Sequence, residues 1–302
     1  MRVEIHVPAT TSNLGPGFDA IGMALDLYST FTVETGVEAT EVVIQGYGQD
    51  LLPRDESHLL LQVTAQALDK LGLTMPPVRL TQHNRVPLGS GLGSSSTAVV
   101  GGLALAQALA GVPFDREALL NDACALEGHP DNAAPCVMGG LVTALWDGAH
   151  CSWLHLPFSA QLGAVVCTPA LSLSTKEMRR ALPEQVPFED AVFNGAHACM
   201  LVGALTTGRL DLLKGAVRDR LHASYRSAFI PGYDAVVRAA EAAGALVATI
   251  SGAGPTIIAL TDRSKDDDVA AAMEAAFSVA GLASTARIVS PRSQGTEVLI
   301  HG

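Results

Sequence analysis

The first part of the chain alternates between hydrophobic and polar residues in the way that is typical of β-strands. In these segments every second side chain is apolar, which places the apolar side chains on one face. The pattern predicts strands at Arg2–Val7, Tyr28–Glu34 and Glu41–Gln45, and a shorter one at Val78–Gln82.

Other segments of the first part have apolar residues at helical spacing. From His58 onward these residues fall three or four positions apart, and Gly72 ends the segment. A second helix is expected from the serines at 94–96 to about Ala110. A third is expected from Asp115, which can cap it, to about Gly128.

The second half has a different order of elements. Strand, helix, strand, strand, helix and strand follow one another, which is the split βαβ or ferredoxin-like order. Prolines at 183, 187 and 231 should break its long helical region. A domain boundary is expected between Trp146 and Gln161. The elements of this half are Leu162–Cys167, the helical regions Thr175–Gly208 and Tyr233–Ala243, Leu246–Ile250, Thr256–Leu260, Asp266–Ala280 and Thr285–Val289.

The charge and cysteine content restrict the possible partners and location. A formal net charge of −11 argues against nucleic acid or an anionic membrane surface, because both attract positive charge. The first residues lack the apolar region of a signal peptide, and the most apolar helical stretch, Ala98–Val112, is shorter than the about 20 residues that span a bilayer. Five cysteines without a Cys-x-x-Cys pair indicate free thiols in a reducing compartment. We therefore expect a soluble, cytoplasmic protein.

The most informative segment is a glycine-rich loop that leads into the second helix. Alternate glycines let backbone N–H groups approach an anion, and the N-terminus of the next helix directs its dipole to the same place. The serine hydroxyls can bind phosphate or a magnesium ion. The loop therefore predicts a site for the phosphates of a nucleotide, formed by Pro87, Leu88, Gly89, Ser90, Gly91, Leu92, Gly93, Ser94, Ser95, Ser96 and Thr97.

This loop differs from two common phosphate loops and resembles a third. It has no lysine, which a P-loop requires, and Ser94 stands where a dinucleotide fingerprint requires glycine. It closely resembles the phosphate loop of the GHMP kinases. That resemblance implies ATP and Mg²⁺ as cofactors and an α+β fold of two domains. Residues 1–155 would form a ribosomal-protein-S5-domain-2-like domain, and residues 156–302 a ferredoxin-like (split βαβ) domain.

Two segments of the first half resemble homoserine kinases in particular. Pro8-Ala-Thr-Thr-Ser-Asn-Leu-Gly-Pro-Gly-Phe-Asp is similar to their amino-terminal motif, and Glu-Gly-His-Pro-Asp-Asn-Ala-Ala-Pro135 to a later one. The first similarity implies that Asn13 and Asp19 contact the substrate. The second implies that Glu127, together with Ser95, holds the metal, whereas His129 and Asn132 contact the substrate.

Three segments of the second half continue the resemblance. Thr175 and Arg179 match a threonine and an arginine one helical turn apart, and Arg226 matches a second substrate arginine. An arginine fork suits a carboxylate because it can bind both oxygens. The segment Ser251-Gly-Ala-Gly-Pro-Thr256 is similar to the superfamily's carboxy-terminal glycine motif. It should pack against the phosphate loop and places Gly252 among the substrate-binding residues.

The resemblance implies ATP-dependent phosphorylation of the side-chain hydroxyl of L-homoserine, a step of threonine biosynthesis. L-Homoserine and ATP would be the binding partners, and the resemblance is compatible with a homodimer. The residues implied in catalysis are Glu127, Ser95, Arg179 and Asn132. No matched residue is an evident general base, because Asn132 stands where mevalonate kinases have an aspartate.

Two alternatives stay open at the level of the sequence. One is another GHMP kinase of mevalonate or sugar type, and the other is a catalytically inactive binding protein with the GHMP fold. Paired arginines together with Asp19 favour a zwitterionic amino acid as the substrate. One departure concerns the adenine pocket, where the family commonly has asparagine and this chain has His58.

Overall fold

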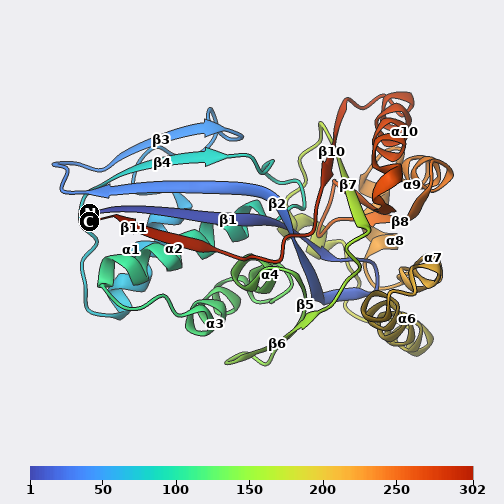
Figure 1. Ribbon diagram of the computed structural model, residues 1–302, viewed down its shortest axis with the longest axis horizontal. Coiled ribbons are helices and arrows are strands. Elements are labelled where there is room, and N and C mark those ends of the chain that lie inside the picture. The colour runs from blue at the N-terminus through green and yellow to red at the C-terminus, as the bar shows by residue number, and fades with distance from the viewer. Residues whose placement is uncertain (302) are drawn as a thin grey trace.

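Two β-sheets with helices packed on them make up the part of the chain that the computed structural model describes, residues 1–301 (Figure 1). The first sheet has seven strands. Five lie in the order β11-β1-β2-β4-β3, and β5 and β6 extend it from β2. The strands are β1 (Arg2–Asn13), β2 (Gly17–Thr35), β3 (Glu41–Gly46), β4 (Val78–Asn84), β5 (Leu141–Trp146), β6 (Cys151–Leu156) and β11 (Glu297–His301).

Four helices cover one face of this sheet, as Figure 1 shows. The alternation along β3 and β4 buries one row of side chains beneath these helices. Asp115 starts α3, because its carboxylate accepts hydrogen bonds from the N–H groups of Glu117 and Ala118 at 3.0 and 3.1 Å. The helices are α1 (Leu59–Lys70), α2 (Ser94–Ala110), α3 (Arg116–Glu127) and α4 (Ala133–Met138).

The second sheet confirms the predicted ferredoxin-like arrangement. Its four antiparallel strands lie in the order β10-β7-β9-β8, which is the split βαβ order. Helices α9 (Tyr233–Ala242) and α10 (Asp266–Val279) pack on one face of it. The strands are β7 (Leu162–Pro169), β8 (Ala245–Ile250), β9 (Ile257–Asp262) and β10 (Ser284–Val289).

The connection from β7 to β8 is divided into short helices. The single helical region expected over residues 175–208 is two helices, α5 (Thr175–Arg180) and α6 (Phe188–Thr207), separated at the predicted proline breaks. After them come α7 (Leu213–Ala216) and α8 (Ala223–Arg226). No helix of residues 1–301 has the length and apolar character that crossing a membrane requires.

The sequence patterns missed part of the first sheet. β1 continues through Pro8 to Asn13, and β2 begins at Gly17, so the two strands form one long hairpin with register shifts after Pro8 and after Ser12. The proline and glycines of this segment are typical of loops, which hides the strand. The hairpin β5–β6, the helix α4 and the strand β11 were also not expected.

A shared core joins the two sheets. The tip of the β1–β2 hairpin, including Leu14, Ile21 and Met23, packs against residues of β7, β9 and α6. The last strand, β11, pairs with β1, so it belongs to the first sheet although it follows β10 in the chain. The division into residues 1–155 and 156–302 stays a prediction. In the structure, the final strand crosses back over that boundary.

Candidate active site

The glycine-rich loop turns sharply into the N-terminus of α2. Gly89, Gly91 and Gly93 all have positive φ angles, at 57°, 82° and 71°. A Cβ atom on Gly93 would lie 2.2 Å from Oγ1 of Thr10, so only glycine fits there. The first N–H groups of α2 have no partner within the helix, and they point toward the loop. This is the arrangement expected of a phosphate site.

The second glycine motif packs against this loop, which confirms the predicted contact. The hydroxyl of Ser251 donates to the carbonyl oxygen of Gly91 at 2.7 Å, and the N–H of Thr256 donates to that of Ser90 at 3.0 Å. A Cβ on Gly91 would lie 2.2 Å from the Ser251 carbonyl oxygen. The two loops therefore fix each other's backbone.

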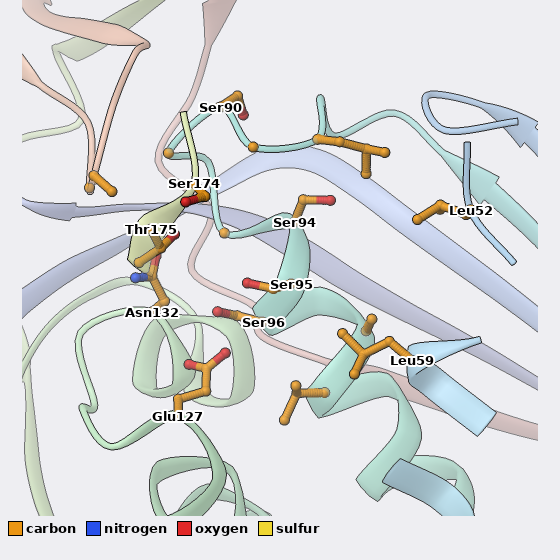
Figure 2. A pocket seen from close by; sticks show the side chains of 18 of the residues that line it. Leu52, Leu59, Ser90, Ser94, Ser95, Ser96, Glu127, Asn132, Ser174 and Thr175 are labelled. Carbon is orange, nitrogen blue, oxygen red and sulfur yellow. The ribbon is translucent and has the colours of Figure 1, made fainter. Parts of the chain in front are cut away.

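A cleft of about 590 Å³ opens at these loops. Figure 2 shows Leu52 and Leu59 on one side of Ser94, Ser95 and Ser96, with further residues on the other side. The side with Leu52 and Leu59 is apolar, which suits the binding of a nucleobase. The cleft is also lined by Pro53, Leu88, Val99, Glu127, His129, Asn132, Thr175 and Gly252.

Glu127, at the end of α3, brings an unsatisfied carboxylate to the middle of the cleft. Its Oε2 atom is buried and has no hydrogen-bond partner in residues 1–301. Burial raises the pKa of Glu127 to about 7, although a hydrogen bond from Ser96 acts in the opposite direction. In Figure 2 the hydroxyls of Ser95 and Ser96 lie above this carboxylate. Ser96 was predicted only as part of the loop, and its contact with Glu127 is new.

At the substrate end, two predicted residues form an ion pair with each other. Arg179 of α5 donates two hydrogen bonds to the carboxylate of Asp19, at 2.8 and 2.9 Å. Asp19 has a φ of 54°, a conformation that non-glycine residues seldom adopt, at the tip of the β1–β2 hairpin. Thr175 begins the same helix as Arg179, and it lines the cleft.

Arg226 is a buried cation without an acidic partner. Its side chain is only 2% exposed, and its hydrogen bonds go to the carbonyl oxygens of Gly252 at 3.1 Å and Met178 at 3.4 Å. It forms no salt bridge within the described chain. Burial, and then the charge of Arg179, lower the pKa of Arg226. A buried guanidinium that has only neutral partners creates a local site for an anion.

Phe18 lies between the charged groups of this end of the site. Its ring is 5.5 Å from the guanidinium of Arg179 and 5.3 Å from that of Arg226, and the ring of His222 stacks on it at 5.0 Å. His222 is in turn held by a 2.8 Å hydrogen bond to the Gly15 carbonyl oxygen. Neither Phe18 nor His222 was among the residues matched to the substrate, although Phe18 belongs to the amino-terminal motif and His222 lies four residues before Arg226.

His129 and Asp131 form a hydrogen-bonded pair beside the cleft. The Nδ1 atom of His129 is 2.6 Å from the carboxylate of Asp131, which is 3% exposed. Burial would lower the pKa of His129, but Asp131 raises it, and the same contact lowers the pKa of Asp131 against the effect of burial. Asp19 lies close enough to complete a three-residue metal site with them. Its carboxylate accepts hydrogen bonds from Arg179, whereas Oε2 of Glu127 has no hydrogen-bond partner among residues 1–301.

Asn132 and Asn13 are both held by the protein. Asn132 accepts from Thr10 at 2.8 Å and donates to Ser12 at 3.1 Å, which fixes its side chain at the edge of the cleft. Asn13 donates to the Gly252 carbonyl oxygen at 3.0 Å and accepts from the N–H of Asp19 at 3.0 Å. Asn13 therefore shapes the hairpin tip that presents Asp19, besides any contact with a substrate.

The unusual His58 lies at the nucleobase side. It is 2% exposed, its Nε2 atom is 2.8 Å from the Gln82 side-chain oxygen, and burial lowers its pKa. Both residues line the cleft. The histidine is thus compatible with the apolar nucleobase side, where a neutral ring packs well.

The fold and the site together define a small-molecule kinase of the GHMP class. The family model described as "GHMP kinases N terminal domain" matches residues 58–140, and "GHMP kinases C terminal" matches residues 201–279. The homoserine kinase of Trichormus variabilis is 43% identical over 295 residues, and the alignment covers 97% of this chain and 97% of that protein. The homoserine kinase of Moorella thermoacetica is 41% identical, and the alignment covers 98% of this chain and 99% of that protein.

A solved structure agrees with these relatives. The crystal structure of homoserine kinase from Cytophaga hutchinsonii has a TM-score of 0.87 and 30% identity to this chain, covering 99% of this chain and 97% of its own. The chain belongs to the homoserine kinase family.

Proposed function

We propose that this protein transfers the γ-phosphoryl group of ATP to the side-chain hydroxyl of L-homoserine, which yields O-phospho-L-homoserine and ADP for threonine biosynthesis. The observation that carries the proposal is the buried guanidinium of Arg226, which has no acidic partner within residues 1–301 and lies near the Arg179–Asp19 pair. A zwitterionic amino acid supplies both the carboxylate that Arg226 lacks and an ammonium group for Asp19. A sugar or mevalonate supplies no ammonium group.

The chain's own residues divide the work of binding between the two sides of the cleft. The glycine loop and the N-terminus of α2 bind the phosphates, and the apolar side with Leu52 and Leu59 takes the adenine. Arg226 and Arg179 bind the carboxylate of homoserine, which leaves its hydroxyl directed at the γ-phosphate. Such positioning supplies several kcal/mol of the barrier reduction in phosphoryl transfer, roughly.

Magnesium is part of the proposal, and the residues present fit it. The buried Oε2 of Glu127 has no hydrogen-bond partner among the described residues, and burial raises the pKa of this carboxyl group to about 7. Glu127 and Ser95 would hold the ion, with Ser96 beside them. When bound, Mg²⁺ neutralises charge on the phosphate oxygens. No residue is placed as an evident general base, because the carboxylate of Asp131 is occupied by His129.

The proposal includes a cytoplasmic location, supported by five cysteines that are all free thiols. The decisive test is an ADP-release assay with homoserine, serine, mevalonate and galactose as acceptors, with and without Mg²⁺. Homoserine should have the highest kcat/KM, and chelation of Mg²⁺ should abolish turnover. Faster turnover of mevalonate or galactose would refute the proposed substrate.

A further inference from the structure

Asn84, the last residue of β4, is connected to both ends of the glycine loop. Its side-chain oxygen accepts hydrogen bonds from the N–H of Val86, just before the loop, at 3.0 Å and from the hydroxyl of Ser29 at 2.8 Å. The Ser29 hydroxyl in turn accepts from that of Thr97, at the end of the loop, at 3.2 Å. Asn84 is only 1% exposed, so these bonds are shielded from water and hold the loop in place.

The other end of the Asn84 side chain holds the turn that follows β3. Its amide nitrogen donates to the carbonyl oxygen of Tyr47 at 2.9 Å, and the N–H of Tyr47 donates to the backbone carbonyl oxygen of Asn84 at 2.9 Å. A Cβ on Gly46 would lie 2.2 Å from that same carbonyl oxygen, so only glycine permits this approach of the two backbones. Asn84 therefore joins the Tyr47 turn to the glycine loop.

The Tyr47 turn also contributes to the nucleobase side of the cleft. It continues to Leu52, whose N–H donates to the carbonyl oxygen of Gly48 at 2.9 Å. A Cβ on Gly48 would lie 2.8 Å from side-chain carbons of both Leu52 and Leu88. Because Leu52 and Leu88 line the cleft from two different segments, a shift of the turn would change the nucleobase side and the glycine loop together.

Arg287 holds the Tyr47 turn from the second sheet. It lies in β10, where its guanidinium donates to the hydroxyl of Tyr47 at 2.9 Å and lies 5.5 Å from the centre of the tyrosine ring. Figure 1 shows the carboxy-terminal ends of β3 and β4 directed toward β10. The contact therefore joins the second sheet to the turn that Asn84 connects with the loop.

We propose that Arg287, Tyr47 and Asn84 position the glycine loop and thereby determine how tightly the protein binds its nucleotide. We call these three residues the β10 relay. None of them lines the cleft, so they act through the turn and the loop and not by touching the ligand. The inference rests on the proposed function only in that the cleft binds a nucleotide, and it does not depend on the acceptor.

Isothermal titration calorimetry with MgADP tests the β10 relay without a phosphate acceptor. Arg287→Met keeps the length of the side chain but removes its charge and its donors, so it should raise the Kd for MgADP about fivefold. Tyr47→Phe removes the hydroxyl alone and should have a similar effect. Arg287→Lys keeps a charged donor and should recover much of the affinity. A contact that only stabilised the fold would change the melting temperature and leave the Kd unchanged.

The matched control is Arg79→Met, which removes another arginine contact from the same pair of strands. Arg79 lies in β4 and donates a 2.9 Å hydrogen bond to the carboxylate of Glu41 in β3. This pair lies at the start of the two strands, at the opposite end from Gly46 and Asn84. Arg79→Met should therefore leave the Kd for MgADP unchanged.

A double-mutant cycle tests whether Arg287 and Tyr47 act as one unit. The combination of Arg287→Met and Tyr47→Phe should raise the Kd about fivefold, as each substitution does alone, and not about 25-fold. Steady-state kinetics should separate the two substrates in the same way. KM for ATP should rise in both single variants, whereas KM for homoserine should stay the same.

Amide hydrogen exchange supplies an independent measurement. The N–H of Val86 is bonded to the side chain of Asn84, so its exchange rate reports on that hydrogen bond. Exchange at Val86 should be faster in Arg287→Met and Tyr47→Phe than in the wild type and in Arg79→Met. Unchanged exchange at Val86 in both variants would contradict transmission through Asn84.

Failure of the β10 relay can be told apart from failure of the proposed function. A wild type that binds no MgADP would overturn both. If the wild type binds MgADP and Arg287→Met and Tyr47→Phe bind it equally well, the β10 relay alone is wrong. The same holds if the two substitutions have independent effects, or if Arg79→Met weakens binding as much as they do.

Discussion

At the scale of single residues, the buried carboxylate of Glu127 lowers the free energy of unfolding when it is ionised and no cation is bound. An unfolded glutamate has a pKa near 4.5, whereas burial raises the pKa of Glu127 in the folded protein to about 7. The folded state therefore holds the proton more tightly. As the pH rises from about 4.5 to 7, this carboxyl group lowers the free energy of unfolding, and the loss is complete above pH 7.

Replacing Glu127 with glutamine should therefore reverse this cost. Without Mg²⁺ and nucleotide, Glu127→Gln should have a higher melting temperature than the wild type at pH 8 and a similar one at pH 5. The difference at pH 8 corresponds to at most about 3–4 kcal/mol, from the shift of the pKa of Glu127 from 4.5 to about 7. Mg²⁺ with ADP should stabilise the wild type more than the variant. Thermal unfolding at the two pH values measures this. A variant less stable at pH 8 would show that the carboxylate is satisfied in some other way.

The same substitution should impair the reaction. With homoserine and MgATP, kcat of Glu127→Gln should fall by about 100-fold, because the ion neutralises charge on the phosphates. Homoserine should still bind, since the arginines lie elsewhere. Near wild-type kcat would remove Glu127 from the metal site.

The two arginines predict a test of substrate recognition. Loss of a shielded, charge-assisted contact costs about 2–4 kcal/mol, so Arg226→Ala should raise KM for homoserine about 30-fold or more, while KM for ATP changes little. Arg180→Ala, at an exposed position of α5, is the control and should have little effect. The analogue 3-amino-1-propanol has no carboxylate and should be insensitive to Arg226→Ala. Equal damage to both substrates would mean that Arg226 acts on folding or phosphate.

Phe18 should contribute to homoserine binding through the contacts of its aromatic ring with the two guanidinium groups. Phe18→Leu keeps the apolar volume but removes cation–π contacts to two guanidinium groups, so KM for homoserine should rise about tenfold. Phe18→Tyr keeps the ring and should restore KM. In an Arg226→Ala background, the effect of Phe18→Leu should become smaller, because one of its partners is gone. Full additivity in steady-state kinetics would count against this role.

Much of the site was predictable from residue types in local motifs, and the missing part depends on contacts between distant segments. The glycine loop, Glu127 and the two arginines could each be found from one short stretch of sequence. The stacking of Phe18 on His222 joins residues about 200 positions apart, and no local pattern indicates such a contact. The pairing of Asp19 with Arg179 was missed for the same reason, because each residue had been matched to the substrate separately.

At the scale of elements, the glycine loop and the Ser251–Thr256 loop behave as one structure. Gly91→Ala would place a Cβ 2.2 Å from the Ser251 carbonyl oxygen, in addition to the cost of its positive φ angle. The variant should lose more stability than the about 1–3 kcal/mol of backbone strain alone, and KM for ATP should rise.

Gly111→Ala provides the matched control for that experiment. Gly111 ends α2 with a φ of 68°, and a Cβ there would meet nothing within 4 Å. It therefore carries the strain without the clash. Denaturant unfolding and ATP kinetics of both variants measure the difference. Equal losses of stability would show that the Ser251–Thr256 loop moves aside easily.

The elements themselves were predicted unevenly, and the reason is physical. Helices α1, α2 and α10 were found close to their observed bounds, α1 from its helical spacing and α2 from the serines at its start. Strands β5 and β6 were missed. They expose Leu145 and Leu154 at 69% and 66%, so their sequence lacks the alternation that marks a half-buried strand. β11 gains its strand conformation from pairing with β1, which is information that its own five residues do not contain.

At the scale of the whole molecule, the two sheets should unfold together. Ser251 joins the loops, and the hairpin tip with Leu14 packs into the core of the second sheet. Calorimetry should therefore show one unfolding transition. MgATP should raise the temperature of the whole transition, because a ligand that binds only the folded state stabilises it. Two transitions, of which only one responds to the nucleotide, would show that the halves are energetically independent.

The pairing of β11 with β1 also has a consequence for biosynthesis. The two strands are separated by roughly 290 residues, so this contact is among the most non-local that the chain can make. A ribosome adds about 5–20 residues per second, which leaves the edge of β1 open for roughly 15–60 s after it emerges. An open strand edge can pair with another nascent chain. The first sheet is thus completed only after residues 297–301 have been synthesised, and until then the edge of β1 is open to pairing with another strand.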